Sequence, residues 1–476
     1  MYTFQDYEAA LAAGKVADFI AAAIKQHIQS DEYKTAVDAD EYDCQRDVLV
    51  NTYTKFIAEH SGSDLVNATA ANNRISSNFF HRLNTQRCTY SLGNGVDFPD
   101  ENIKPRLGPH FDRDFYRLAY CALKHGQCFG FWNNDRLYIF PLTEFVPLCD
   151  EITGALRAGI RFWRMDDTKP MTAVLYAEDG YTRYCTRENA SGYDFAEVEP
   201  RRAYITHGQR TGAYGFEITG YENYSTLPVI RMWGSDLHQS TLVGMKERID
   251  SYDLIQSGFA NDLQDCAQIY WIIENCGGMS DTDLQNFLNK LNRDHIATAD
   301  TKSMGVEPTS LKPYVQDVPF ESRTAYLQHI RGAIYEDFGA LDVTNMSAST
   351  RTATEIESAY QPMDENADDF EYQCIDFIQQ LLALMGITGD AATPIFKRNR
   401  IANQYEQTQM IMLAAQYLDA ETILDKLPWI SVDEVADIMA RKAAEDVERT
   451  DEEQTEEPTE EPTAEQTENE DAEQEA

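Results

Sequence analysis

The chain lacks any apolar run long enough to cross a bilayer, although it contains 476 residues. A membrane-spanning helix needs about 20 consecutive apolar residues, so the sequence predicts no membrane partner. The first twenty residues also lack the basic stretch and apolar core of a secretory signal. The length itself predicts about two to four domains with a sizeable core.

Basic residues are scarce relative to acidic ones: 40 Lys and Arg stand against 80 Asp and Glu, for a formal net charge of −40. Proteins that grip nucleic acid neutralise phosphates with clustered cations, so this balance argues against tight nucleic-acid binding. It is compatible with a surface along which DNA must slide without sticking.

Cysteines are few and lack a framework of close pairs. There are nine, an odd number, which is typical of reduced thiols in a cytosolic protein. Cys121 and Cys128 flank His125, a pattern that raises the alternative of a metal site. A second ligand pair at zinc-finger spacing is missing, so packing thiols are the favoured interpretation. We expect no metal and no other cofactor.

The usual catalytic signatures are missing as well. The sequence has no GxxxxGK[ST], HExxH or GxSxG motif, and no GxGxxG between a strand and a helix. Asp112 and Asp114 form the closest candidate carboxylate pair, but residues two apart on a helix point in different directions. We therefore expect no catalytic residues and no enzyme.

One long helix is expected over 236–266, a stretch without proline. At 1.5 Å per residue it would be roughly 45 Å long, well beyond the average globular helix of about 11–12 residues. Such a helix is either the core of a large α-rich domain or a strut in a ring or bundle. Its apolar residues follow spacings of three and four along one face: Leu242, Met245, Ile249, Tyr252, Ile255, Phe259 and Leu263.

The remaining pattern predicts an α+β fold. Short runs rich in aromatic and β-branched residues, separated by turns, indicate a mainly antiparallel β-rich region over 127–232. A strand over 268–276 opens a small α/β insertion. Pro362 should kink the third long helix. Helices are expected at 7–27, 43–60, 65–90, 112–124, 320–341, 352–385 and, in a terminal cluster, 404–418, 420–426 and 431–445. An acidic segment should connect the first two, and a short helix is expected at 280–292 within the insertion.

Turn residues mark where several elements should end. Gly93-Asn94-Gly95 should stop the helix at 65–90, Asn133-Asn134-Asp135 should form a hairpin turn, and Gly386 should end the helix at 352–385. Two helices carry apolar stripes: Phe115, Leu118, Ala119 and Ala122 at 112–124, and Tyr326, Ile330, Ala333, Ile334 and Phe338 at 320–341.

Composition changes sharply after residue 446. The segment 447–476 is dominated by Glu, Thr and Gln and contains no aromatic residue. Such a segment cannot bury enough apolar surface to offset the entropy of ordering, which predicts disorder. The favoured role is a tail that increases solubility. The alternative is an acidic segment that attracts a basic partner.

The order of these pieces resembles the portal proteins of tailed bacteriophages, of the siphovirus head-to-tail connector type. The stretches that carry the resemblance are NNRISSNFF running into TYSLGNGVDF, then 124–163, 227–265 and RTATEIES. The resemblance covers roughly residues 20–445. It implies a helix-rich wing (1–125) with a β-rich lobe (126–235), stem helices at 236–266 and 319–341, a clip at 267–318, a tunnel loop at 342–351, a kinked wing helix and linker at 352–399, a crown at 400–446 and an acidic tail at 447–476.

The resemblance also implies a function and partners. The chain would form a ring, typically of twelve subunits, at one capsid vertex of the virion, assembled in the host cytoplasm. The ring would pass double-stranded DNA during packaging and ejection. It would bind the terminase large subunit, the major capsid and scaffolding proteins and a head-completion adaptor. Two alternatives are a carboxylate-dependent hydrolase using residues around 127–200 and a helical scaffold that never meets DNA.

Three groups of site residues follow from the resemblance. The stem stripe given above would pack between neighbouring subunits. The clip interface would use Trp271, Phe287, Leu288 and Tyr314. The channel and tunnel loop would use Asn345, Ser347, Ser349, Thr350, Arg351, Lys246 and Arg331, although ion pairing is the favoured role for the basic residues.

Overall fold

In the computed structural model of the protein, two compact units, Met1–Asn399 and Arg400–Ala476, are described separately. The structure describes residues 2–52, 56–58, 64–66, 71–134, 136–166, 168–187, 193–211, 215–266, 270–274, 282, 310–314, 320–342, 353–389, 392–399, 411–415, 417–427, 435 and 438–442.

Four short helices replace the two expected over 7–60: α1 (Phe4–Ala12), α2 (Val16–Gln29), α3 (Asp31–Asp43) and α4 (Val48–Thr52). The expected helix over 7–27 is interrupted at Gly14, whose φ of 66° lies in the left-handed region. The acidic connection expected over 28–42 is instead α3. The Ser30 side chain caps it, and its first turn is acidic, which favours a helix start.

The expected helix over 65–90 is wrong in its first half. Residues 64–66 form a strand, β2 (Asp64–Val66), paired with β1 (Phe56–Ala58). Residues 71–78 are not helical, because side chains of another helix accept their backbone N–H groups. Only α5 (Phe79–Leu92) is helical, and it ends at Gly93, which confirms the predicted stop.

The β-rich region is confirmed, and all its described strand pairs are antiparallel. A five-stranded sheet has the order β10-β9-β8-β7-β6, a three-stranded sheet has the order β13-β4-β5, and β11 and β12 form a separate ribbon. The predicted turn between β4 and β5 contains Asn134 at a φ of 61°. The strands are β4 (Gln127–Trp132), β5 (Leu137–Pro141), β6 (Phe145–Cys149), β7 (Leu156–Trp163), β8 (Thr172–Ala177), β9 (Gly180–Thr186), β10 (Phe195–Arg202), β11 (Ile205–Thr211), β12 (Gly215–Glu222) and β13 (Val229–Trp233), with a 3-10 turn η1 (Leu142–Glu144) after β5.

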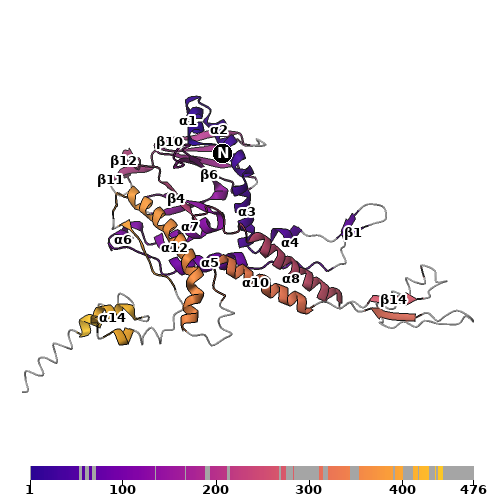
Figure 1. Cartoon of the computed structure of the whole chain (residues 1–476). Helices are drawn as coiled ribbons and strands as arrows, with labels where there is room; N and C mark the ends of the chain where they lie inside the picture. Colours follow the sequence, from indigo (N-terminus) through magenta and orange to yellow (C-terminus); the bar gives the residue numbers. More distant parts are fainter. Residues whose placement is uncertain are drawn as a thin grey trace, which may run out of the picture. The chain divides into compact units, whose positions relative to one another are not determined.

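Two of the apolar cores in the described part of the first unit pack its helices against its sheets. The larger one packs α7 (Phe111–His125) between the three-stranded sheet and α12 (Ala353–Leu384). The predicted stripe of α7 is confirmed, since Phe115, Leu118, Ala119 and Ala122 are fully buried. The second core packs α1 and α2 against the five-stranded sheet, as Figure 1 shows. The β3 strand (Val96–Asp97) pairs with β16 (Ile395–Phe396), and α6 (Ile103–Leu107) follows β3.

The long helices differ in detail from expectation. The first, α8, runs Lys246–Cys266 rather than from 236. The preceding turn caps α7 instead, because the hydroxyls of Ser240 and Thr241 donate to the carbonyls of Lys124 and Leu123 (2.5 and 3.1 Å). Strands β14 (Tyr270–Glu274) and β15 (Ser310–Tyr314) pair, and α10 (Phe320–Phe338) follows.

Pro362 lies inside the continuous helix α12, which ends shortly before Gly386, as expected. In the second unit, α14 (Ala420–Lys426) matches an expected helix and is capped by the Asp419 side chain. The helix expected within the clip, the tunnel loop and the acidic tail fall outside the described residues, apart from residues 282 and 342.

Candidate functional site: the paired long helices and their joint with the body

Helices α8 and α10 run antiparallel to each other. Ion pairs join Arg248 to Asp337 and Arg323 to Asp262 (2.5 Å), so the start of one helix lies beside the end of the other. The rings of Phe259 and Phe320 lie 5.4 Å apart near the far end of the pair. The two helices flank the paired strands β14 and β15 in sequence, and Figure 1 shows the helices side by side. They are the pair that the resemblance assigns to a stem.

A ladder of polar side chains ties α8 to residues 73–77. Asp253, Ser257 and Asn261 are buried at successive four-residue spacings on α8. They accept the backbone N–H groups of Ser77 (2.9 Å), Ile75 (3.0 Å) and Asn73 (2.6 Å), respectively.

The spacing explains why the ladder fits. Four helical residues rise about 6 Å, and two extended residues rise about 6.6 Å, so every second amide of the extended segment meets every fourth side chain of the helix. The extended backbone therefore finds partners without forming a helix or a sheet.

Two carboxyl groups are buried together where this ladder begins. Asp47 and Asp253 are 1% and 0% exposed. Asp47 Oδ1 accepts the Val50 N–H (2.9 Å), while its Oδ2 and Oδ1 of Asp253 have no hydrogen-bond partner. Burial, and then the neighbouring Asp47 carboxyl, raise the pKa of Asp253 to about 7. With this pKa, Asp253 binds its proton beside a second buried carboxyl group up to about neutral pH.

Helix α10 ends in a second joint, made by three side chains that cap its carbonyls. Arg87 and Asn366 donate to the Phe338 carbonyl (both 3.2 Å), and Gln86 donates to the Leu341 carbonyl (3.1 Å). The Arg87 guanidinium also lies 4.7 Å from the centre of the Phe338 ring. A cation at a helix C-terminus is stabilising, so this joint fixes the end of α10 and the residues up to Leu341.

The predicted stem stripe is divided between two environments. Leu242, Met245 and Ile249 are already buried within this chain, in the core shared with α3, α5 and α10. Tyr252 packs edge-on against Phe79 at 5.0 Å. Ile255 and Phe259 are half-buried, and Leu263 is exposed. Sequence reasoning missed Leu254, which is exposed on α8, whereas Tyr326 was expected on the apolar stripe of the second long helix and is exposed there.

The basic residues predicted to face DNA have carboxylate partners within the chain. Lys246 pairs with Asp38 (2.5 Å) and Arg331 with Asp342 (3.0 Å). The structure therefore bears out ion pairing for these two side chains. The other predicted channel residues, Asn345, Ser347, Ser349, Thr350 and Arg351, lie outside the described residues, as do Phe287 and Leu288 of the clip. Trp271 and Tyr314 lie on the paired strands β14 and β15.

The thiol cluster around His125 is a hydrogen-bonded chain. Cys121 Sγ lies 3.6 Å from His125 Nδ1, and His125 Nε2 lies 2.9 Å from Asp40 Oδ1. Burial lowers the pKa of His125, but the Cys121 sulfur and the Asp40 carboxylate outweigh it and raise that pKa to about 9. Among the described residues, no group of three or more His, Cys, Asp or Glu has the geometry of a metal site.

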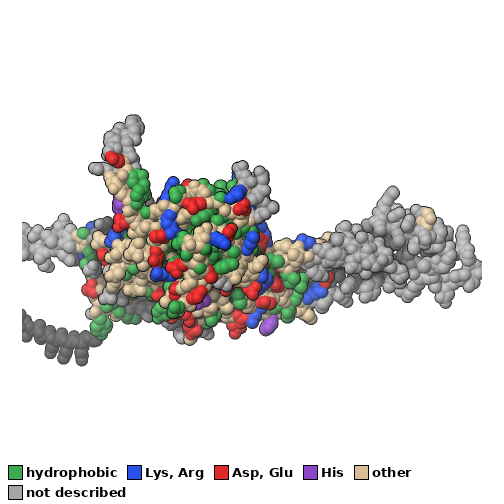
Figure 2. All heavy atoms as spheres, turned by 90° about the horizontal axis from the view of Figure 1, so that it is seen from above, with side chains coloured by type: hydrophobic (Ala, Val, Ile, Leu, Met, Phe, Trp, Pro, Cys, Tyr) green, Lys and Arg blue, Asp and Glu red, His purple; other side chains and the backbone are tan. Residues whose placement is uncertain are grey.

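The surface mixes charges of both signs. Figure 2 shows Lys and Arg side chains interspersed with Asp and Glu over the face seen from above. Within the described part of the chain, no helix is long and apolar enough to cross a membrane. The described residues thus present a pair of long helices, held to the body by polar joints, beside a surface of mixed charge.

Comparisons with known proteins name the family. The family model described as phage portal protein, SPP1 Gp6-like, matches residues 23–459. The portal protein of Clostridium phage phiCD119 is 25% identical over 387 residues, which cover 76% of this chain and 82% of that protein. The portal protein of Bacillus phage SPP1 is 22% identical over 424 residues, covering 82% and 79%. The chain belongs to the SPP1 Gp6-like family of phage portal proteins. It is a structural component of the phage head, as the resemblance implied.

Proposed function

We propose that this portal protein forms a ring, typically of twelve subunits, which is the channel for DNA packaging and ejection. The α8–α10 pair would be the stem, residues 267–318 the clip, residues 342–351 the tunnel loop, 352–399 the kinked wing helix with its linker, and 400–446 the crown. The single observation that carries this proposal is the antiparallel helix pair, joined by ion pairs at both ends and flanking a pair of antiparallel strands in sequence.

The charge pattern supports a channel that lets DNA slide. Four basic residues of the stem helices, Lys246, Arg248, Arg323 and Arg331, all have carboxylate partners within the chain. A paired cation holds phosphate weakly, and the net charge of −40 repels it. The channel wall would therefore neither bind DNA tightly nor obstruct its passage.

The exposed apolar residues support packing between neighbouring stems. Leu254 is 37% exposed and Leu263 51% on α8, and Tyr326 is 45% exposed and Phe320 57% on α10. We propose that these side chains, together with the half-buried Ile255 and Phe259, are covered by the adjacent subunit.

The ring would be assembled in the host cytoplasm with scaffolding and major capsid proteins. It would bind the terminase large subunit and a head-completion adaptor through the clip, with Trp271 and Tyr314 on its strands. The protein would act without catalysis of its own.

A packaging assay tests this function. Heads assembled with the chain should protect genome-length DNA from nuclease once terminase and ATP are added. Heads assembled without it should protect none, and the chain should be found at one vertex of each filled head. Equal packaging with and without the chain would contradict the proposal.

A further inference from the structure

The β11–β12 ribbon has no sheet of its own to join. Each of its strands pairs only with the other among the described strands. An isolated two-stranded ribbon is marginally stable in water, and a strand edge without a partner is a template for pairing with another chain. The ribbon therefore needs a cover that the described part of the chain does not provide.

The root of the ribbon is fixed, whereas its described side chains are exposed. The Tyr204 hydroxyl donates to the Ala177 carbonyl (2.6 Å), and the Tyr224 hydroxyl accepts the Asn134 N–H (3.0 Å). Further out, Ile218 is 51% exposed and Tyr221 68%. The pairing register shifts between Ile218 and Gly220, so Ile218 and Tyr221 lie opposite Gly208 and Thr206. Those two partners are two residues apart on β11, which places Ile218 and Tyr221 on the same face. The ribbon presents these apolar side chains on one face from a fixed base.

Strand β13 lies at the edge of the three-stranded sheet, and one of its two sides is unpaired among the described strands. Trp132 N–H donates to the Pro228 carbonyl and Gly234 N–H to the Gly126 carbonyl, so even-numbered residues of β13 bond to β4. In an antiparallel pair the alternate residues direct their backbone groups outward. Val229, Arg231 and Trp233 therefore present N–H and C=O groups on the side away from β4, where no described strand pairs with them.

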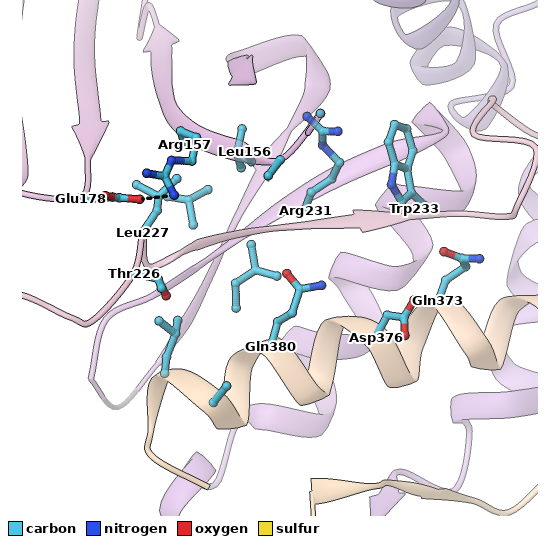
Figure 3. Close-up of a pocket in the computed structure, with 16 residues that line it drawn as sticks. Leu156, Arg157, Glu178, Thr226, Leu227, Arg231, Trp233, Gln373, Asp376 and Gln380 are labelled. Carbon is cyan, nitrogen blue, oxygen red and sulfur yellow. Dashed lines mark ion pairs between the residues drawn. The ribbon is translucent and has the colours of Figure 1, made fainter. Parts of the chain in front are cut away.

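A groove of ≈ 550 Å³ lies along this edge. Figure 3 shows Arg231 and Trp233 rising from one face of β13, and Asp376 and Gln380 pointing from α12 toward the other face. The Arg157–Glu178 ion pair (3.2 Å) forms a further part of the lining. We call this cavity the edge groove. Its lining mixes donors, acceptors and apolar side chains, which suits an added strand.

The ribbon and the edge groove carry complementary charges. Arg231 stacks over Trp233 at 4.9 Å, donates from Nη2 to Cys149 Sγ (2.6 Å), and has no ion pair with a described carboxylate. Glu217 on β12 is exposed and likewise has no ion pair in the described part of the chain. A carboxylate that reaches the exposed part of the Arg231 guanidinium would gain a charge-assisted hydrogen bond.

We propose that the ribbon of one subunit adds as strands to the β13 edge of its neighbour, with Glu217 against Arg231. The ribbon and the groove are different surfaces, so the contact is heterologous, and repeated contacts of this kind close a ring. The β11–β12 strands, at about 3.4 Å per residue, extend roughly 25 Å, enough to follow the whole of β13. This inference rests on the proposed ring and assigns it a contact outside the stem.

Charge reversal tests the pairing. Glu217→Arg should raise the subunit concentration at half-assembly by about tenfold or more, measured by mass photometry, because like charges would meet in the groove. Arg231→Glu should do the same, and the double variant should assemble better than either single one. The matched control is Glu197→Arg, the same change at an exposed position of β10, which should assemble normally. A Glu217→Arg ring as stable as the wild type, or a double variant no better than the weaker single variant, would overturn the pairing.

Hydrogen exchange tests the same contact in the wild-type protein, without any substitution. Amides of residues 205–208 and 217–222 should exchange at least tenfold more slowly in wild-type rings than in dissociated subunits. Rings whose ribbon amides exchange as fast as in free subunits would refute the inference and leave the ring intact. Protection that appears only in assembled heads would assign the ribbon to a capsid partner instead. Absence of rings would refute the proposed function itself.

Discussion

The buried pair Asp47 and Asp253 makes the joint at the base of α8 sensitive to pH. Burial, followed by the Asp47 carboxyl, raises the pKa of Asp253 from 3.8 to about 7. The folded state therefore binds more protons than the unfolded state between about pH 4 and pH 7. Stability falls as pH rises through this window and reaches its low plateau above it.

The size of the effect follows from the shift. A change from 3.8 to about 7 corresponds to about 3 pKa units, or up to about 4 kcal/mol at 1.36 kcal/mol per unit. Asp253→Asn keeps an oxygen to accept the Ser77 N–H and supplies a permanent donor toward Asp47. At pH 8 the contact between α8 and residues 73–77 should thus be more stable in the variant than in the wild type. At pH 4 its stability should be equal in the two proteins.

Hydrogen exchange of the Ile75 and Ser77 amides measures this directly. At pH 8 these amides should exchange more slowly in Asp253→Asn, by a factor of up to about three orders of magnitude. Comparison at one pH cancels the intrinsic exchange rate. The control, Asp166→Asn, removes an exposed charge and should change neither amide. If the Ile75 and Ser77 amides of Asp253→Asn exchange at pH 8 as fast as in the wild type or faster, the raised pKa of Asp253 does not weaken the joint and the account is refuted.

Three further predictions concern the joints and the stem. Gly339→Ala should lower the free energy of unfolding of the subunit by about 1–3 kcal/mol, because Gly339 has a φ of +62° and an added Cβ would lie 2.1 Å from the side-chain nitrogen of Asn366. Gly258→Ala should stabilise α8 slightly, because an added Cβ there meets nothing within 4 Å. Equal effects of the two substitutions in thermal unfolding would contradict this. Arg398→Leu should lower the free energy of unfolding by about 1–3 kcal/mol, because three carboxylates of α12 lose the cation that they share. An unchanged melting temperature would be inconsistent with that network. Leu254→Asp with Leu263→Asp should weaken ring assembly without lowering the subunit melting temperature, because both side chains are exposed; normal rings from this double variant would show that the two leucines are not stem contacts.

Much of the fold could be predicted from local patterns. The stripe of α7 and the short strands of the β-rich lobe were predicted correctly, because helix period and turn residues encode them directly. The stop after α5 was predicted for the same reason, since Gly93 and Gly95 follow its last turn.

The joints could not be predicted in this way, because their partners are distant in sequence. Residues 73–77 carry a helical pattern, but their amides bond to Asp253 and to the side chains four and eight residues beyond it. The start of α8 was placed too early because Ser240 and Thr241 bond to carbonyls of α7. A signal was present: polar residues at four-residue spacing on an otherwise apolar helix face. That spacing is typical of side chains that accept bonds from a neighbouring extended segment.

The central claim is that the α8–α10 pairs of many subunits line one channel. Electron microscopy of the purified full-length chain, in the absence of heads, tests it most directly. We expect rings with a central hole, twelvefold symmetry, and density for residues 246–266 and 320–338 around that hole. Single subunits at every concentration and salt, or rings in which these helices lie at the outer rim, would contradict the account.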